Sequence, residues 1–371
     1  MKKLLTLILA LVMIFTLVAC GDEPAANGGD DVDVSKPAAQ DSGVKFTQVE
    51  KGLALDTDGR IWSFSLVEEP KVLCDAAKFT FISEGNGLCC ALDENGGLWT
   101  WGMNRAGQLG DGTTTDRPTP QKILDGVKMV SAYDSNAFAI KTDGTLYQWG
   151  NGNNFTKLRD SMEDRDNILT PTAVKTDAKF QYVATAGATV AIDTDGNRYC
   201  WGAPCTTMGY GANQIDDAFD PSAAITPFSL KKIKNDTAPK GTYYFGNGTT
   251  YIIDANNTLY ISGGRGSRLD PFETNGSFKT FTKVADKVAM LTKSNYGTLY
   301  IDTDGNIWGW GSSAFKLCPE TTKPVQITNG IKFIDVAILS SGSTMAYALA
   351  ADGSIYTFGE KNSTPTVLEV K

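Results

Sequence analysis

Histidine is absent from the 371-residue chain. This absence removes the commonest general base near neutral pH and the commonest neutral metal ligand. Positive charge is also scarce, since 34 Lys and Arg residues stand against 42 Asp and Glu residues and give a net charge of −8. A phosphate backbone would be repelled by such a chain. We therefore expect no nucleic acid partner, no metal site and no cofactor.

The N-terminus lacks an apolar run long enough to span a bilayer. Lys2 and Lys3 precede the uncharged segment Leu4–Val18, whose 15 residues fall short of the roughly 20 that a transmembrane helix needs. A charged start, a short apolar region and a small-residue cleavage site are typical of a signal peptide. An ordinary secretory peptide and an uncleaved transmembrane helix are the alternatives.

The end of this segment reads Leu17-Val18-Ala19-Cys20 and resembles the lipobox of bacterial lipoproteins. The resemblance implies that Cys20 is diacylated and becomes the new N-terminus, so that lipid on Cys20 anchors an extracytoplasmic protein to a bacterial membrane. Residues 21–44 contain no aromatic residue and many Asp, Gly, Pro and Ala residues, which is typical of a flexible, disordered tether. We expect a signal peptide at 1–19, the lipidated Cys and acidic tether at 20–44, and a folded domain at 45–371.

One pattern recurs seven times in the folded part: a short apolar strand, a turn rich in Asp, Asn and Gly, and a strand ending in aromatic residues. Asp-Gly and Asn-Gly accept the positive φ angles of tight turns, and β-branched and aromatic residues favour strands. Each copy is therefore predicted to be a β-hairpin. The copies are Leu53–Phe64, Cys90–Gly102, Phe138–Gly150, Val190–Gly202, Tyr251–Gly263, Leu299–Gly311 and Tyr347–Gly359.

Further strands flank each hairpin. An apolar strand precedes it, as at Lys128–Ala132, and a strand that begins with Pro follows it, as at Pro324–Ile327. Four strands per copy make one blade, and seven blades in a ring protect almost all sheet edges. With about 47 residues per blade, the period is also that of a propeller. We predict an all-β fold, a seven-bladed β-propeller with four-stranded antiparallel blades.

The second copy continues as Trp101-Gly-Met-Asn-Arg-Ala-Gly-Gln-Leu-Gly-Asp-Gly-Thr113, and Met208–Gly211 is a fainter echo in the fourth. These residues resemble the regulator of chromosome condensation (RCC1-type) repeat family. The resemblance extends over Phe46–Lys371 and implies the family's seven-bladed propeller. The founding activity of the family is nucleotide exchange on a nuclear GTPase, and we do not expect it of an exported chain.

Three recurring residue types have both a structural and a functional interpretation. The Asp-Thr-Asp-Gly runs at Asp56, Asp193 and Asp302 suit tight turns, although paired carboxylates also suit calcium. The recurring Trp and Tyr residues indicate packing between blades, with a sugar-stacking platform as the alternative. Six cysteines remain besides Cys20; we expect buried thiols, and a Cys200–Cys205 bridge is the disulfide that the compartment permits.

Function is expected where the repeats differ, because a symmetric scaffold becomes specific through its irregular loops. Insertions follow the hairpins of the third copy, at Asn151–Pro171, and of the fourth, at Ala203–Lys240. Both should emerge at the same end of the propeller. The predicted ligand-binding residues are Met208, Tyr210, Asp216, Phe219 and Phe228 in the fourth copy, and Arg265 and Arg268 in the fifth.

These features favour a surface-displayed binding module that recognises a protein or cell-wall ligand with one propeller face and performs no catalysis. Some secreted propellers that this chain resembles inhibit enzymes such as β-lactamases, so a hydrolase inhibitor is a specific alternative. The third hypothesis is a glycan-active enzyme with a carboxylate pair from Asp216, Asp217 and Asp220, since that chemistry needs no histidine.

Overall fold

The structure, a computed structural model, divides the chain into the units Met1–Ala38 and Ala39–Lys371. Only parts of the second unit are described below. The described residues are 43–64, 69–151, 167–185, 188–202, 231–232, 239–246, 249–263, 278–294, 296–311, 315–328, 330–339, 344–359 and 362–369. Their regular structure is entirely β-strand. Within these ranges, a search for helices long and apolar enough to cross a membrane finds none.

The strands form seven four-stranded antiparallel sheets, each built from four consecutive strands. The first strands are β1 (Phe46–Glu50), β5 (Phe79–Gly85), β9 (Val127–Tyr133), β13 (Phe180–Thr185), β17 (Gly241–Gly246), β21 (Val288–Lys293) and β25 (Phe333–Leu339). The second strands are β2 (Leu53–Asp56), β6 (Leu88–Asp93), β10 (Asn136–Lys141), β14 (Ala188–Asp193), β18 (Thr249–Asp254), β22 (Gly297–Asp302) and β26 (Met345–Ala350). The third strands are β3 (Ile61–Ser63), β7 (Leu98–Gly102), β11 (Leu146–Gly150), β15 (Arg198–Gly202), β19 (Leu259–Gly263), β23 (Ile307–Gly311) and β27 (Ile355–Gly359). The fourth strands are β4 (Lys71–Cys74), β8 (Arg117–Leu124), β12 (Ile168–Ala173), β16 (Lys231–Lys232), β20 (Phe278–Ala285), β24 (Thr321–Gln326) and β28 (Asn362–Val367).

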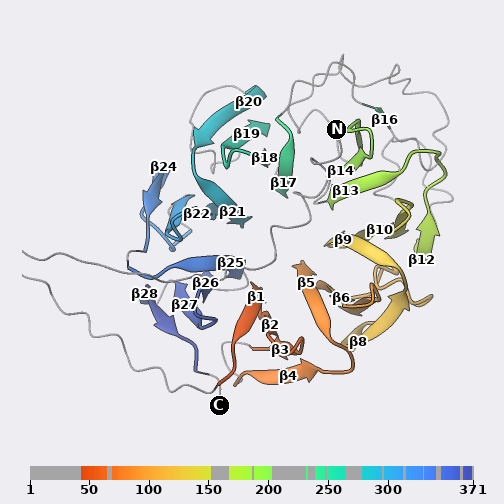
Figure 1. Cartoon of the computed structure of the whole chain (residues 1–371), viewed down its shortest axis with the longest axis horizontal. Helices are drawn as coiled ribbons and strands as arrows, with labels where there is room; N and C mark the ends of the chain where they lie inside the picture. Colours follow the sequence, from red (N-terminus) through yellow and green to blue (C-terminus); the bar gives the residue numbers. More distant parts are fainter. Residues whose placement is uncertain are drawn as a thin grey trace, which may run out of the picture. The chain divides into compact units, whose positions relative to one another are not determined.

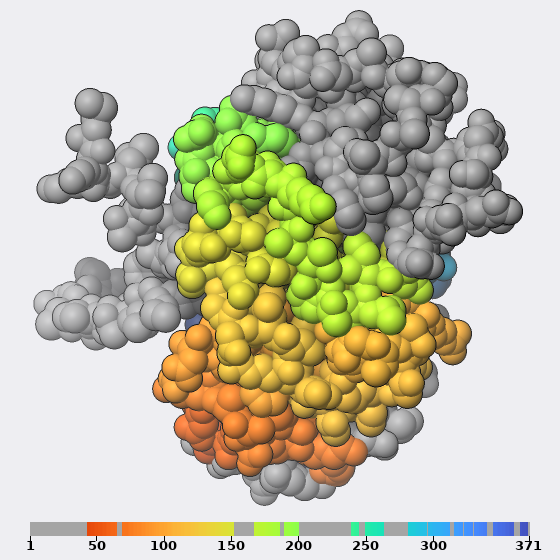
Figure 2. Space-filling view, turned by 90° about the vertical axis from the view of Figure 1, so that its right-hand side faces the viewer, coloured from red at the N-terminus to blue at the C-terminus, as the bar shows by residue number. Residues whose placement is uncertain are grey.

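These sheets are the blades of a seven-bladed β-propeller, which confirms the predicted fold. We number them 1 to 7 in chain order, so that β1–β4 form blade 1 and β25–β28 form blade 7. The first strands lie innermost in the ring and the fourth strands outermost (Figure 1). Seen from the side, blades 1 to 3 follow one another from orange through yellow to green (Figure 2). The seven predicted hairpins are the second and third strands of the blades.

The turn between these two strands is built on a carboxylate. In blade 6, one oxygen of Asp302 accepts the backbone N–H groups of Asp304 and Asn306, each at 2.9 Å. The other oxygen accepts Nε1–H of Trp308 at 2.7 Å. Burial raises the pKa of Asp302, but the hydrogen bonds from Trp308 and Asn306 outweigh burial and leave this pKa below its usual value. Asp56, Asp93 and Asp193 accept hydrogen bonds in the same way.

Successive blades meet at junctions that repeat one hydrogen bond. The first residue of a blade donates its N–H to the carbonyl of the turn Gly or Asn in the preceding blade, over 2.7–3.0 Å. The donor and acceptor pairs are Phe79 and Gly59, Val127 and Gly96, Phe180 and Gly144, Val288 and Asn257, Phe333 and Gly305, and Phe46 and Gly353.

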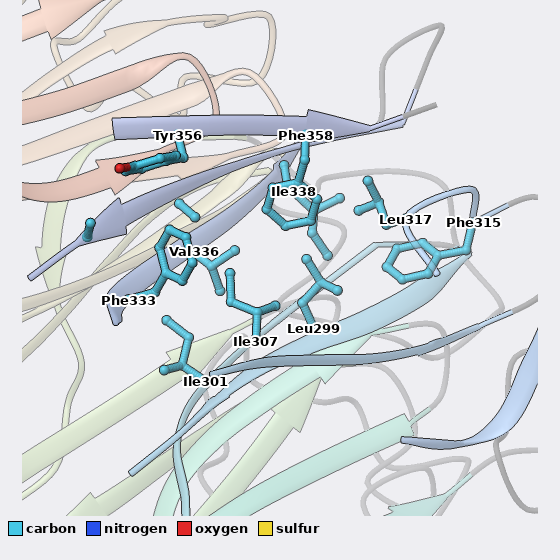
Figure 3. Packing of buried hydrophobic residues seen from close by; sticks show 13 residues of the cluster. Leu299, Ile301, Ile307, Phe315, Leu317, Phe333, Val336, Ile338, Tyr356 and Phe358 are labelled. Atoms are coloured by element: carbon cyan, nitrogen blue, oxygen red, sulfur yellow. The ribbon is translucent and has the colours of Figure 1, made fainter. Parts of the chain in front are cut away.

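Apolar side chains fill the space between blades. Figure 3 shows the junction of blades 6 and 7, where Ile307 faces Phe333 and Val336. The aromatic residues at the ends of the third strands join such clusters, since Trp101, Trp149 and Trp310 are all buried. This confirms the packing role predicted for those three rings.

Ring closure needs no strand exchange, because each end of the folded domain contributes a complete blade. The N–H of Phe46 donates to the carbonyl of Gly353 at 3.0 Å. The N–H of Val49 donates to Oδ2 of Asp335 at 3.0 Å. Phe46 and Val49 also pack with Ile355 in one buried cluster. Blade 1 therefore docks on blade 7 as it would on any other neighbour.

Candidate functional site

The two ends of the blades carry different connections. Because the strands of a blade alternate in direction, the turns between first and second strands and the segments after the third strands lie at one end. We call this end the loop face. The turns between second and third strands lie at the opposite end, which we call the turn face.

The long insertions belong to the loop face. The chain leaves the third strands of blades 3 and 4 at Gly150 and Gly202 and re-enters the fourth strands at Ile168 and Lys231. Both insertions therefore depart from and return to the loop face. The chain enters the folded domain at the turn face, where Lys45 lies against Gly353. The carbonyl of Lys45 accepts the N–H of Thr57 at 2.9 Å.

The residues predicted from sequence to bind ligand lie outside the described residues. They are Met208, Tyr210, Asp216, Phe219, Phe228, Arg265 and Arg268. The predicted lipid anchor Cys20 and the carboxylates Asp217 and Asp220 also lie outside them. The structure describes the strand ends from which the insertions depart, and those ends converge on the loop face.

Three exposed apolar side chains lie at the loop-face end of their blades, in blades 2, 3 and 6. Within the described ranges the large exposed apolar residues number five: Val72, Met103, Tyr133, Tyr296 and Ile334. Met103 follows the last residue of β7, Tyr133 ends β9, and Tyr296 lies between β21 and β22. Those three are loop-face residues, whereas Val72 is in the outer strand β4 and Ile334 is near the turn-face end of β25.

The loop-face turns of blades 2 and 3 support two of these side chains rigidly. Nδ2 of Asn86 donates to Oδ1 of Asp134 at 2.9 Å, and the N–H of Asp134 donates to the carbonyl of Gly85 at 2.7 Å. Met103 packs over Gly87, where a Cβ would come within 2.8 Å of Met103 Sδ. Hydrogen bonds between the two turns and packing on Gly87 therefore support the backbone that carries Met103 and Tyr133.

The signature segment of blade 2 serves the fold of its own loop. Asn104 is fully buried, and its Oδ1 accepts the N–H of Leu109 at 2.9 Å while its Nδ2 donates to the carbonyl of Thr113 at 3.0 Å. Trp149 of blade 3 donates Nε1–H to the carbonyl of Gln108 at 2.8 Å. The segment therefore fixes a loop and docks it on the next blade.

Acidic groups collect where the inner strands of blades 7, 1 and 2 adjoin. Burial, reinforced by nearby Asp335, raises the pKa of Glu50 to about 8. Burial raises the pKa of Asp335 to about 6, even though backbone N–H groups bind its carboxylate. Nζ of Lys51 forms an ion pair with Glu84 Oε2 at 3.0 Å. In the described part of the chain, no three Cys, Asp or Glu residues lie close enough together to hold a metal ion.

Burial makes two of the described thiols, Cys90 and Cys318, poor nucleophiles. Cys74, Cys89, Cys90 and Cys318 are free; Cys90 is buried as expected, whereas the other three are only half-buried. Burial raises the pKa of Cys90 to about 12 and that of Cys318 to about 11. Both are therefore protonated near neutral pH, and the thiolate is the reactive form. The predicted Cys200–Cys205 bridge lies outside the described residues, because the side chain of Cys200 is not among them.

Three contact residues were not singled out from the sequence. Gln48 and Asp335 hold the inner strand of the next blade, the former by donating Nε2–H to the carbonyl of Ile82 at 2.7 Å. Arg198 is buried at a position where the other blades have Ile or Leu. Aligning the seven copies by their turns shows the Arg198 substitution, whereas the Gln48 and Asp335 contacts depend on how blades face each other.

The family model named Regulator of chromosome condensation (RCC1) repeat matches residues 95–138. The Ultraviolet-B receptor UVR8 of Arabidopsis thaliana is 35% identical over 128 residues, which cover 33% of this chain and 28% of the receptor. The mitochondrial RCC1 domain-containing protein RUG3 of the same plant is 21% identical over 319 residues, or 80% of this chain and 69% of that protein. The chain thus spans little more than a quarter of the receptor's length.

Solved structures share the fold. Yeast RCC1 (Prp20), in a crystal structure with Kap60, has a TM-score of 0.63 and 20% identity, with coverage of 81% of this chain and 78% of that one. Human WBSCR16 has a TM-score of 0.60 and 14% identity, with coverage of 81% and 84%. Residues 95–138 thus match the RCC1 repeat, and the likeness to the solved structures is one of fold.

Proposed function

We propose that the chain is a lipid-anchored, extracytoplasmic binding module whose loop face recognises a protein ligand without catalysis. The observation that carries this proposal is that three of the five large exposed apolar residues in the described ranges, Met103, Tyr133 and Tyr296, lie at the loop-face end of their blades. Exposed aromatic and Met side chains are enriched at protein interfaces. The long insertions of blades 3 and 4 depart from the same face.

The place where the chain enters the propeller is compatible with a ligand on the loop face. The chain enters the domain at Lys45 on the turn face, so a tether that runs from a lipidated Cys20 reaches the propeller on the side opposite the loop face. The point of attachment is then not on the face proposed to bind a partner. The yeast relative with this fold is bound by another protein, Kap60, in its crystal structure, which is in keeping with a protein ligand.

The binding proposal is tested with the full-length anchored protein. Proteins crosslinked to it on intact cells are compared with those crosslinked to a loop-face variant carrying Met103→Ser, Tyr133→Ser and Tyr296→Ser. A matched control carries Val72→Ser and Ile334→Ser, which are equally exposed apolar residues away from the loop face. We expect the loop-face variant to lose a partner that the control retains. Equal recovery by both variants would contradict the proposal.

The anchor is tested separately. Labelled palmitate should be incorporated into the wild-type chain and into Cys74→Ala, but not into Cys20→Ala. Equal labelling of Cys20→Ala would remove the anchor while leaving the binding proposal standing. Recovery of a β-lactamase or another hydrolase as the partner would specify an inhibitor, whereas release of sugars from purified peptidoglycan would indicate the glycan-active enzyme instead.

A further inference from the structure

Six of the seven junctions share one set of apolar residues. The third strand of the preceding blade begins with a buried Ile or Leu, which faces a Phe or Val at the first position of the next blade and a Val, Ile or Leu further along the same strand. At the junction of blades 1 and 2 these residues are Ile61, Phe79 and Ile82. At the closing junction of blades 7 and 1 they are Ile355, Phe46 and Val49.

The junction of blades 4 and 5 departs from this set at all three positions. Arg198 begins the third strand, Gly241 is the first residue of blade 5, and Tyr243 takes the place of the aliphatic residue. Arg198 is only 3% exposed. Its Nη2 donates to the carbonyl of Pro239 at 2.9 Å, and its guanidinium carbon lies 5.7 Å from the centre of the Tyr243 ring.

A change in backbone register accompanies these substitutions. The other six first strands have a bulge between their first and third residues, whereas β17 pairs with β18 without interruption from Gly241 to Gly246. In this register a Cβ on residue 241 would lie 1.9 Å from the carbonyl oxygen of Ile253. Only glycine fits there, so the Phe or Val of the other junctions is absent and the Arg198 side chain is accommodated.

The repeated backbone contact is also missing at this place. Between the described residues Gly196 and Gly241, the structure has no counterpart of the hydrogen bond that the other six junctions make. Polar contacts connect the two inner strands instead, since the N–H of Tyr243 donates to the Tyr182 hydroxyl at 2.9 Å. The rings of Tyr182 and Tyr243 lie 5.9 Å apart.

We infer that the ring opens first between blades 4 and 5, and not at the closing junction where the two ends of the domain meet. Separating two apolar surfaces exposes them to water at a cost. Separating blades 4 and 5 instead hydrates a guanidinium and a hydroxyl, which water solvates well. The closing junction keeps the full apolar set together with the hydrogen bonds that the N–H groups of Phe46 and Val49 donate to blade 7.

Native-state hydrogen exchange tests this inference through three matched amides. The N–H groups of Tyr243, Ile82 and Val49 each bind a side chain of the preceding blade, at 2.9, 2.9 and 3.0 Å. After correction for intrinsic rates, the Tyr243 amide should exchange at least tenfold faster than the other two. The free energy of the opening that exposes the Tyr243 amide should fall with urea concentration. Its slope should be smaller than that of global unfolding and larger than that of a local fluctuation.

Exchange of the Tyr243 amide at the rate of the other two, or without dependence on urea, would overturn the inference. So would faster exchange at Val49, since the ring would then open at its ends. Arg198→Leu introduces the residue type of the other junctions and should slow hydrogen exchange at the Tyr243 amide. Faster exchange in this variant would show that the Arg198 side chain holds the junction closed, against the inference. Ile61→Leu is the matched control at another junction and should leave the Tyr243 and Val49 amides unchanged. If Arg198→Leu does not fold, the three wild-type rates still decide.

Discussion

Raising the pH from 5 to 8 should destabilise the propeller through two carboxyl groups near the closing junction. The folded-state pKa values of Glu50 and Asp335 are raised from 4.5 to about 8 and from 3.8 to about 6. A raised pKa means that the folded protein holds its proton more tightly than the unfolded chain. The free energy of unfolding therefore falls as the pH rises from the unfolded to the folded pKa.

The magnitude follows from about 1.4 kcal/mol per pKa unit. Between pH 5 and 8 this rule gives an upper limit of about 5 kcal/mol for the two groups together. Water reaches the partly exposed Glu50, and Lys51 offsets part of the repulsion. We therefore expect a loss of about 2 kcal/mol, measured as the free energy of unfolding in urea at pH 5, 6, 7 and 8.

The turn carboxylates titrate below this pH window, and Lys293 titrates at its upper limit. Turn carboxylates such as Asp93 and Asp302 have lowered pKa values and lose their contribution only below the window. Burial lowers the pKa of Lys293 to about 8, so that lysine increases stability as the pH rises further. The other charged groups that face Glu50 are Lys51, which lowers its pKa, and Glu84, which raises it.

One variant and one control test whether Glu50 causes the decline in stability. Glu50→Gln removes the more strongly shifted group and should flatten the decline between pH 6 and 8. Asp304→Asn alters an exposed turn carboxylate and should keep the wild-type slope. A wild-type stability that is constant or rising from pH 5 to 8 would refute the reasoning, as would an unchanged slope in Glu50→Gln.

Asp302→Ala should lower the free energy of unfolding by about 2–3 kcal/mol, because two backbone N–H groups and Trp308 lose their acceptor. Ile307→Ala should cost about 2–5 kcal/mol by leaving a cavity between blades 6 and 7. Asn104→Ala should cost about 1–3 kcal/mol, because the buried N–H of Leu109 loses its partner. Urea unfolding checks all three, and a cost below 0.5 kcal/mol would contradict the role assigned to that residue.

Most of the fold could be predicted from the sequence repeat, for a physical reason. Asp-Gly turns and alternating apolar strands are local features, and seven copies of one local pattern leave few ways to bury their apolar faces. The roles of Asp302 and Trp308 as turn acceptor and donor follow from that pattern. The contact of Asp335 with Val49 does not, because it joins residues 286 positions apart whose approach depends on how blades 7 and 1 face each other.

The candidate site was less predictable than the fold. Sequence differences between copies pointed to the insertions of blades 3 and 4, whose ends do converge on one face. Met103, Tyr133 and Tyr296 were missed because a single apolar residue in a turn has no periodicity to mark it. Their common exposure became apparent only once the alternation of strand directions placed their turns at the same end of the blades.

Closure without strand exchange predicts how the chain tolerates a circular permutation. A permutant that joins residue 371 to Lys45 and begins at Phe79 would keep all seven blades as sets of four consecutive strands. It adds one linker at the closing junction and removes the one between β4 and β5, so the loop lengths nearly balance. Since a doubling of loop length costs only about 0.6 kcal/mol, we expect unfolding free energies within about 1 kcal/mol of wild type. Far-ultraviolet circular dichroism and urea unfolding provide the measurement.

A permutant that fails to fold would mean that Phe46 and Val49 dock on blade 7 only when the chain begins with blade 1. The equivalence of the closing junction to the others would then have to be abandoned.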